Sequence, residues 1–79
     1  MMIASGSCSS NGMETITSSQ ECNVAAKNIG LIRGDAMETE SVPRPEGCYD
    51  NGFLWFSTNT ANKGNGAEST RRSICKKTG

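Results

Sequence analysis

Four cysteines, Cys8, Cys22, Cys48 and Cys75, constrain this chain more than any other feature of its sequence. They lie near both ends and at two interior positions of a chain of 79 residues. A chain this short has room for one small core and rarely holds a fold by burial alone. An even number of cysteines in a short polar chain is typical of disulfides in an oxidising compartment. We therefore expect an extracellular, secretory or other lumenal protein.

Zinc ligation and free buried thiols are the alternatives for these cysteines. Structural zinc sites usually present ligands in close pairs such as C-x2-C, because two ligands on one turn lower the entropic cost of assembling the site. Here no two cysteines lie closer than 14 positions, and the chain contains no histidine. The absence of C-x-x-C also argues against a redox role. We expect no metal and no cofactor.

The composition is polar, and its charges balance. Apolar residues make up 34 % of the chain, below the globular average of about 45–50 %, which raises disorder as an alternative. The formal net charge is zero and the aromatic residues are clustered, and both features favour a cross-linked fold instead. Acidic residues gather over 35–50 and basic residues over 63–77. The basic end could bind phosphate, but it also complements the acidic middle, and we expect no nucleic-acid partner.

Targeting and membrane signals are not apparent in the sequence. Residues 1–4 are too few for the apolar core of about 7–15 residues that a signal peptide needs. No stretch approaches the roughly 20 apolar residues of a membrane span. We therefore expect a single small domain over residues 1–79, either mature or cut from a longer chain.

The best helix signal covers residues 19–29. Ser18 and Glu21 have the spacing of a capping box, in which each side chain satisfies a backbone N–H at the helix start. Gly30 stands where a left-handed C-cap belongs. Residues at helical spacing would form the buried face, with small alanines allowing close approach to a sheet: Cys22, Ala25, Ala26 and Ile29.

Strand signals surround this helix. Residues 48–57 hold all four aromatic side chains of the chain, and Asn51-Gly52 between two such runs predicts a hairpin. A two-residue turn would pair Cys48 with Trp55, whereas a longer loop would shift that register. Further strands are expected within 1–7, 37–42 and 72–76, with a long surface loop over 58–70. The predicted fold class is α+β, with one helix packed on a small antiparallel sheet.

Four cysteines allow three disulfide pairings. Cys22 with Cys48 would staple the helix to the hairpin, and Cys8 with Cys75 would then tie the two ends together. In the loop-entropy model, closing 26 positions contributes about 3.5 kcal/mol and the longer loop somewhat over 4 kcal/mol. We favour this arrangement, with Cys8–Cys22 and Cys48–Cys75 as the alternative.

Five short segments around the cysteines and aromatic residues form a recognisable arrangement. They are Gly6-Ser7-Cys8, Ile16-Thr17-Ser18 with Glu21-Cys22 and Ala25-Ala26, Arg44-Pro45-Glu46-Gly47-Cys48-Tyr49, Leu54-Trp55-Phe56 and Ile74-Cys75-Lys76. Their arrangement resembles a small four-cysteine module in predicted proteins of marine microalgae and other protists. The resemblance implies an autonomous extracellular or lumenal unit without an assigned catalytic activity, often within longer chains. Ser57 stands where such modules tend to have Asn, so no functional residue is carried over from that segment.

Aromatic and basic side chains around the hairpin form the first candidate site. Arg44, Tyr49, Phe53 and Trp55 could make a surface for a carbohydrate or a protein. The simpler interpretation is that these aromatic side chains are the core of a core-poor domain. One helix cannot cover both faces of an aromatic strand, so we expect some of this surface to be exposed. The predicted function is a non-catalytic binding or assembly module.

Other functions are weaker alternatives. Arg33-Gly34-Asp35 follows the predicted helix and matches an integrin-type adhesive tripeptide. The rigid Pro43-Arg44-Pro45 segment suggests a secreted inhibitor, and a small accessory subunit of a larger complex is a further possibility. An enzyme is not expected, because no histidine is present and the acidic residues of the middle segment lie on predicted loops, where they stay solvated.

Overall fold

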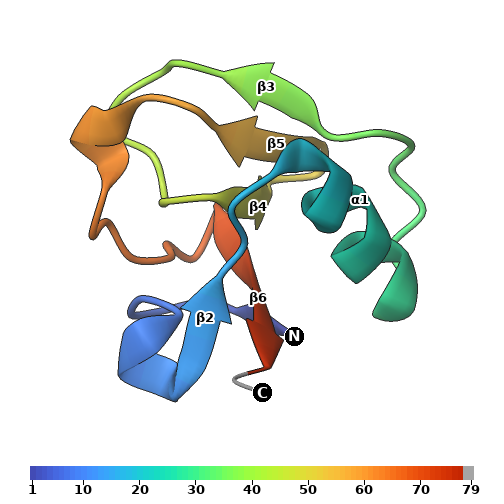
Figure 1. Ribbon diagram of the computed structural model, residues 1–79, viewed down its shortest axis with the longest axis horizontal. Coiled ribbons are helices and arrows are strands. Elements are labelled where there is room, and N and C mark those ends of the chain that lie inside the picture. Colours follow the sequence, from blue (N-terminus) through green and yellow to red (C-terminus); the bar gives the residue numbers. More distant parts are fainter. Residues whose placement is uncertain (78–79) are drawn as a thin grey trace.

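One helix packs on a mixed sheet of six strands in the computed structural model, which describes residues 1–77 (Figure 1). The elements in chain order are β1 (Met2–Ile3), the 3-10 helix η1 (Ser9–Asn11), β2 (Met13–Thr15), α1 (Ser19–Asn28), β3 (Met37–Thr39), β4 (Cys48–Asp50), β5 (Leu54–Ser57), the 3-10 helix η2 (Thr60–Asn62) and β6 (Arg72–Lys77). This arrangement confirms the α+β class. The last two residues of the expected domain, 78–79, lie outside the described residues.

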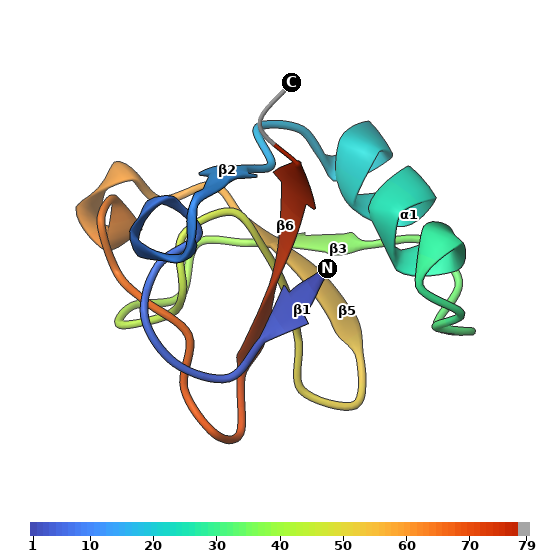
Figure 2. The same ribbon diagram turned by 90° about the horizontal axis from the view of Figure 1, so that it is seen from below.

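The strands are ordered β1-β6-β4-β5-β3. The strand β2 is outside this order and pairs with the last three residues of β6, whereas β4 pairs with its first two. Figure 2 shows β6 running through the middle of the molecule with β1 beside it. The expectation of an antiparallel sheet is wrong at one edge, where β3 pairs with β5 in parallel. The chain reverses twice between these strands, in the 40–47 loop and in the hairpin, so β3 and β5 run in the same direction. The other strand pairs are antiparallel.

The β4–β5 hairpin has a three-residue loop over 51–53 rather than a two-residue turn. Cys48 therefore pairs with Phe56, and Tyr49 pairs with Trp55. The Asn51 side chain fixes the loop, because its Oδ1 accepts a hydrogen bond of 3.2 Å from the backbone N–H of Phe53. Side chains alternate along a strand, so Tyr49 and Trp55 share the face opposite Cys48.

The helix α1 begins and ends close to the predicted boundaries. The Ser18 hydroxyl accepts a hydrogen bond of 3.1 Å from the backbone N–H of Glu21. At the other end, Gly30 has φ +83° and Leu31 N–H donates to the Ala26 carbonyl at 2.9 Å. Together with the bond from Gly30 N–H to the Lys27 carbonyl, this is a Schellman C-cap.

Both favoured disulfides are present, Cys8–Cys75 and Cys22–Cys48, so the alternative pairing is wrong. Cys22–Cys48 joins α1 to β4 inside the main core, which contains Ile16, Cys22, Ala26, Cys48, Leu54 and Ile74. The helix packs against β5 and β6 from this side. No helix within residues 1–77 is long and apolar enough to cross a membrane.

Candidate binding site

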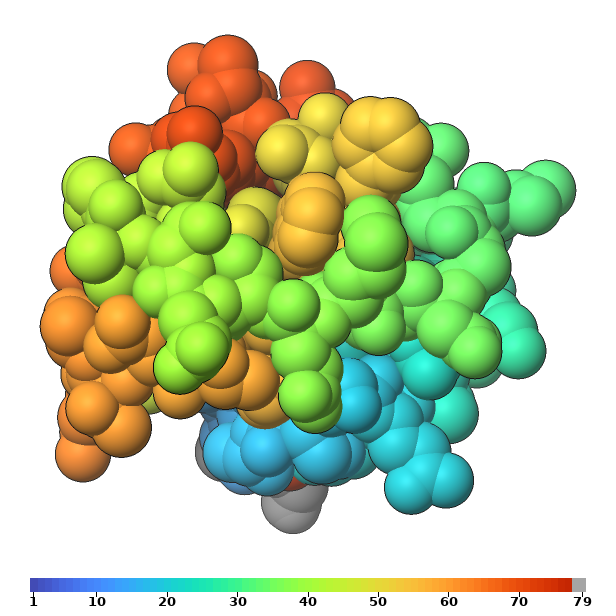
Figure 3. Space-filling view, turned by 90° about the horizontal axis from the view of Figure 1, so that it is seen from above, coloured from blue at the N-terminus to red at the C-terminus, as the bar shows by residue number. Residues whose placement is uncertain are grey.

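A polar hollow of about 180 Å³ lies on the sheet face that points away from α1. Its side chains come from β3 and the loop that follows, from both strands of the hairpin, and from the turn before β6. Figure 3 shows these segments adjoining on one side of the molecule, in yellow-green, gold and red-orange. The lining residues are Thr39, Ser41, Arg44, Tyr49, Asn51, Trp55 and Arg71. We call this site the two-arginine hollow.

Two aromatic side chains form its floor. Tyr49 is only 2 % exposed, whereas Trp55, which pairs with it across the hairpin, is half-buried. The Trp55 indole Nε1–H donates a hydrogen bond of 2.9 Å to Asn51 Oδ1. Because the same oxygen holds the hairpin loop, the loop conformation also fixes the orientation of the indole ring.

Two guanidinium groups flank the tyrosine. Burial raises the pKa of Tyr49 above its usual value of 10.0, and the positive charges of Arg44 and Arg71 act in the opposite direction. Both arginines therefore lie close to the same phenol. Arg44 Nη1 donates to the Pro43 carbonyl at 2.7 Å, and Arg71 Nη1 forms an ion pair of 2.8 Å with Glu68 Oε2. An arginine side chain has five N–H donors, so most of the donors of both groups stay available.

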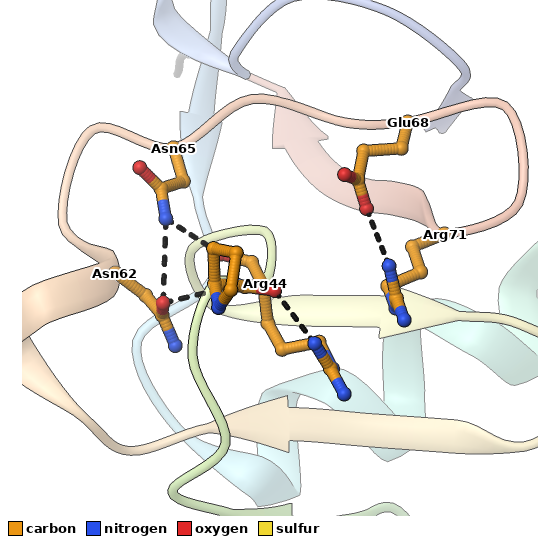
Figure 4. A network of polar contacts seen from close by, with 6 residues as sticks. Arg44, Asn62, Asn65, Glu68 and Arg71 are labelled. Atoms are coloured by element: carbon orange, nitrogen blue, oxygen red, sulfur yellow. Dashed lines mark hydrogen bonds and ion pairs between the residues drawn. The ribbon is translucent and has the colours of Figure 1, made fainter.

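Two asparagines, Asn62 and Asn65, hold the backbone of Arg44 from one side (Figure 4). Asn62 Oδ1 accepts a hydrogen bond of 3.0 Å from Arg44 N–H, and Asn65 Nδ2 donates to the Arg44 carbonyl, also at 3.0 Å. Asn62 is 1 % exposed although it lies in the segment 58–70 that we expected to be a surface loop. That expectation is wrong at η2, because the loop folds back to anchor the segment that carries Arg44.

The structure brings together three of the four residues proposed from the sequence. Arg44, Tyr49 and Trp55 line the two-arginine hollow, whereas Phe53 is 63 % exposed in the hairpin loop and lies outside it. Sequence reasoning missed Arg71, which belongs to the basic end of the chain and gave no separate signal. It also missed the second role of Asn51, whose position before Gly52 indicated only a turn.

The adhesive tripeptide lies on a different part of the surface. Arg33 Nε forms an ion pair of 2.9 Å with Asp50 Oδ1, and the Asp50 side chain is 9 % exposed. Asp35 is exposed in the loop after α1. An integrin-type interaction through Arg33 would have to break this ion pair, so the adhesive function stays a prediction with an added energetic cost.

Two larger hollows lie along α1 and have a different character. One, of about 420 Å³, includes Val24 and Ala25, and its charged groups Glu21 and Lys76 already form an ion pair of 3.0 Å. The other, of about 440 Å³, is mainly apolar and includes Leu31 and Ile32. Neither brings an aromatic ring together with cationic donors.

Neither a cluster of metal ligands nor a known relative indicates what this hollow binds. Among residues 1–77, no three or more acidic or cysteine side chains gather as a metal-binding cluster. No protein-family model matches the chain, and no curated protein or solved structure is significantly similar to it. The resemblance to a protist four-cysteine module therefore stays a prediction.

Proposed function

We propose that this protein is a non-catalytic binding module of a secreted, surface or lumenal protein, and that it binds an anionic ligand in the two-arginine hollow. The observation that carries the proposal is the convergence of Arg44 and Arg71 on Tyr49, beside a half-buried Trp55. Arginine and tryptophan are the side chains most often found at the energetic centre of binding surfaces. Charge-assisted bonds from a guanidinium to an acid group are also stronger than neutral ones.

The charge of Arg44 has no obvious structural purpose. Within the described part of the chain, no carboxylate lies within ion-pair distance of it. Its side chain is half-buried, and two asparagines fix its backbone. A cation held in place without a counter-ion, next to a second cation, is suited to an anionic ligand.

Two further features support the non-catalytic and extracytosolic parts of the proposal. The raised pKa of Tyr49 moves the phenol away from the neutral range in which general acid–base catalysis works best. Two disulfides are consistent with an oxidising compartment. A protein or carbohydrate partner would reach the hollow from solvent, because Ser41 and Asn51 at its rim are exposed.

An accessory subunit of a larger complex is the second candidate function. Ile32 is 92 % exposed and Phe53 63 % exposed, and both are large apolar side chains suited to a protein partner. The secreted-inhibitor function suggested by the Pro43-Arg44-Pro45 segment stays a prediction.

The test is an NMR titration of the oxidised protein with sodium sulfate, sodium acetate and, as a neutral probe, glucose. We expect saturable shifts of the Trp55 indole N–H and of the arginine side-chain signals with the anions. The Arg44→Gln/Arg71→Gln double variant should lose them. Arg72→Gln is the matched control. Arg72 stands beside Asp50 in the β4–β6 register, one residue along from Tyr49, so it belongs to the sheet face opposite the two-arginine hollow. Saturable shifts that survive in the double variant, or none with either anion, would refute the proposal.

A further inference from the structure

The two-arginine hollow combines features that together point to one class of anion. Resting on the function proposed above, we propose that its ligand is an acidic sugar, whose carboxylate binds Arg44 and Arg71 while its ring lies on Trp55. Each part of this assignment has a separate structural basis, in the indole, in the neutral polar groups and in the arginines.

The Trp55 indole provides a fixed aromatic platform. Its Nε1–H is bonded to Asn51, so the ring has one orientation, and as a half-buried side chain it keeps part of its surface accessible. The face of an aromatic ring carries negative electrostatic potential. The C–H groups on one side of a sugar ring carry small positive charges, and these groups can therefore stack on the indole.

The neutral polar groups and the size of the hollow suit a single sugar ring. Thr39, Ser41 and Asn51 supply hydroxyl and amide groups that can exchange hydrogen bonds with ring hydroxyls. The volume of about 180 Å³ is below the roughly 300–1,000 Å³ of a pocket for a drug-sized ligand. One ring with its acid group is thus a better match than a folded peptide segment.

The arginines select for a carboxylate, and Glu68 acts as an internal competitor. Arg71 Nη1 already donates to the Glu68 carboxylate in an ion pair of 2.8 Å, which shows that this guanidinium binds a carboxylate in its present conformation. The pair is local, at positions i and i+3, and the Glu68 side chain is 48 % exposed. Exposed pairs of this kind are weak, so the carboxylate of a bound sugar can displace Glu68.

The experiment is calorimetry at low salt with a uronic-acid tetrasaccharide and with the neutral hexose tetrasaccharide of the same linkage. We expect the acidic sugar to bind the native protein at least about tenfold more tightly than the neutral one, as a charge-assisted bond allows. Arg44→Gln and Arg71→Gln should each abolish that preference, and Arg72→Gln should keep it. Glu68→Gln should tighten the binding of the acidic sugar about two- to fivefold, because the competing carboxylate is gone.

The aromatic platform needs its own variants. Trp55→Leu should weaken both sugars at least about tenfold, the effect expected when a stacking aromatic is lost, whereas Trp55→Phe should retain most of the affinity. Unfolding curves identify variants that fail to fold. If Trp55→Leu or an arginine variant fails to fold, the affinities of Trp55→Phe and Glu68→Gln test the proposal. If the titration with sulfate and acetate succeeds but the tetrasaccharide binds no better than its neutral counterpart, the sugar assignment is refuted and the anion-binding function stands. Tighter binding of an acidic peptide than of the tetrasaccharide would refute it in the same way.

Discussion

Asn62 Nδ2 donates a hydrogen bond of 2.7 Å to the hydroxyl of Ser57, and both side chains are buried beneath the loop that carries Arg44. The same amide nitrogen donates to the Ser41 carbonyl at 2.8 Å. The amide oxygen accepts from the backbone N–H of Arg44 and from Asn65 Nδ2. One side chain thus connects η2, β5 and the 41–44 segment, and it uses its hydrogen-bonding capacity fully.

Replacing this asparagine should destabilise the protein strongly. Asn62→Ala removes the part-buried hydrogen bonds to the Ser41 carbonyl and the Arg44 N–H and the buried one to the Ser57 hydroxyl, and each group left without a partner costs up to about 1–3 kcal/mol. With the cavity that the side chain leaves, we expect a loss of about 3–5 kcal/mol in the free energy of unfolding. Urea denaturation followed by the fluorescence of Trp55, the only tryptophan, measures it.

Asn65→Ala is the control for this prediction. Asn65 is half-buried and donates one good side-chain hydrogen bond, to the Arg44 carbonyl at 3.0 Å. Its loss should cost about 1 kcal/mol. Equal losses in the two variants would contradict the role of Asn62 as the central residue of this network.

The two disulfides should contribute different amounts to the free energy of unfolding, in an order that loop length alone does not predict. The entropic model gives about 4.4 kcal/mol for Cys8–Cys75, which spans 67 positions, and about 3.5 kcal/mol for Cys22–Cys48, which spans 26. All four cysteines are buried, but only Cys22 and Cys48 belong to the main core cluster. We expect Cys22→Ala/Cys48→Ala to be the more destabilising double variant, because it also removes packed atoms from the core.

Urea denaturation of the two double variants side by side tests this order. The remaining disulfide should stay intact in each, as peptide mapping without reduction would show. A larger loss for Cys8→Ala/Cys75→Ala would mean that chain entropy dominates over core packing in this protein.

The parts of the fold that depend on local chemistry could be predicted from the sequence. The capping residue Ser18 and the C-cap Gly30 fix α1 through hydrogen bonds within a few residues, so their signals lie next to each other in the chain. The disulfide pairing followed from placing Cys22 on that helix and Cys48 on the hairpin. The parallel β3–β5 pair depends instead on how a polar loop crosses the sheet, and short-range patterns do not encode that path.

The candidate site was only partly predictable for the same reason. Arg44, Tyr49 and Trp55 lie within twelve positions of one another, whereas Arg71 reaches them only through the pairing of β6 with β4. The strand β2 and the buried Asn62 also depend on contacts between distant segments. Their residues are polar or weakly apolar, so neither had a pattern that sequence reasoning could detect.

Gly47 should tolerate no side chain. It has φ +77°, and a Cβ atom there would lie 2.7 Å from the Ile16 carbonyl oxygen and 2.7 Å from Thr15 Cγ2. One of these neighbours is backbone and cannot move without shifting the chain before α1. We expect Gly47→Ala to lower the free energy of unfolding by about 3 kcal/mol or more, the sum of a left-handed backbone and an overpacked contact.

Gly30→Ala separates these two contributions. Gly30 has φ +83°, but nothing lies within 4 Å of a Cβ atom at that position. Only the backbone penalty applies, and we expect a loss of about 1–2 kcal/mol. Thermal unfolding of both variants gives the comparison, and equal losses would show that the close approach of Gly47 to Ile16 is not a constraint.

The ionisation of Tyr49 offers a direct test of the two-arginine hollow. Tyr49 is the only tyrosine, so the ultraviolet absorbance of its phenolate gives the pKa without interference from other groups. Burial raises this pKa above 10.0, while Arg44 and Arg71 lower it in part. We therefore expect a midpoint above 10.0 in the folded protein. Removing either positive charge should raise it further, because the phenolate loses a favourable neighbour.

The sign of the linked stability change follows from the same shift. The folded state holds the tyrosine proton more tightly than the unfolded state, so this contribution to stability is complete below pH 10.0 and is lost as pH rises through the folded pKa. Arg44→Gln and Arg71→Gln should shift the absorbance midpoint upward, and Arg72→Gln should leave it unchanged, because Arg72 lies on the opposite face. If neither of the first two variants moves the midpoint, the guanidinium groups do not converge on Tyr49, and the hollow lacks the paired charge on which anion binding depends.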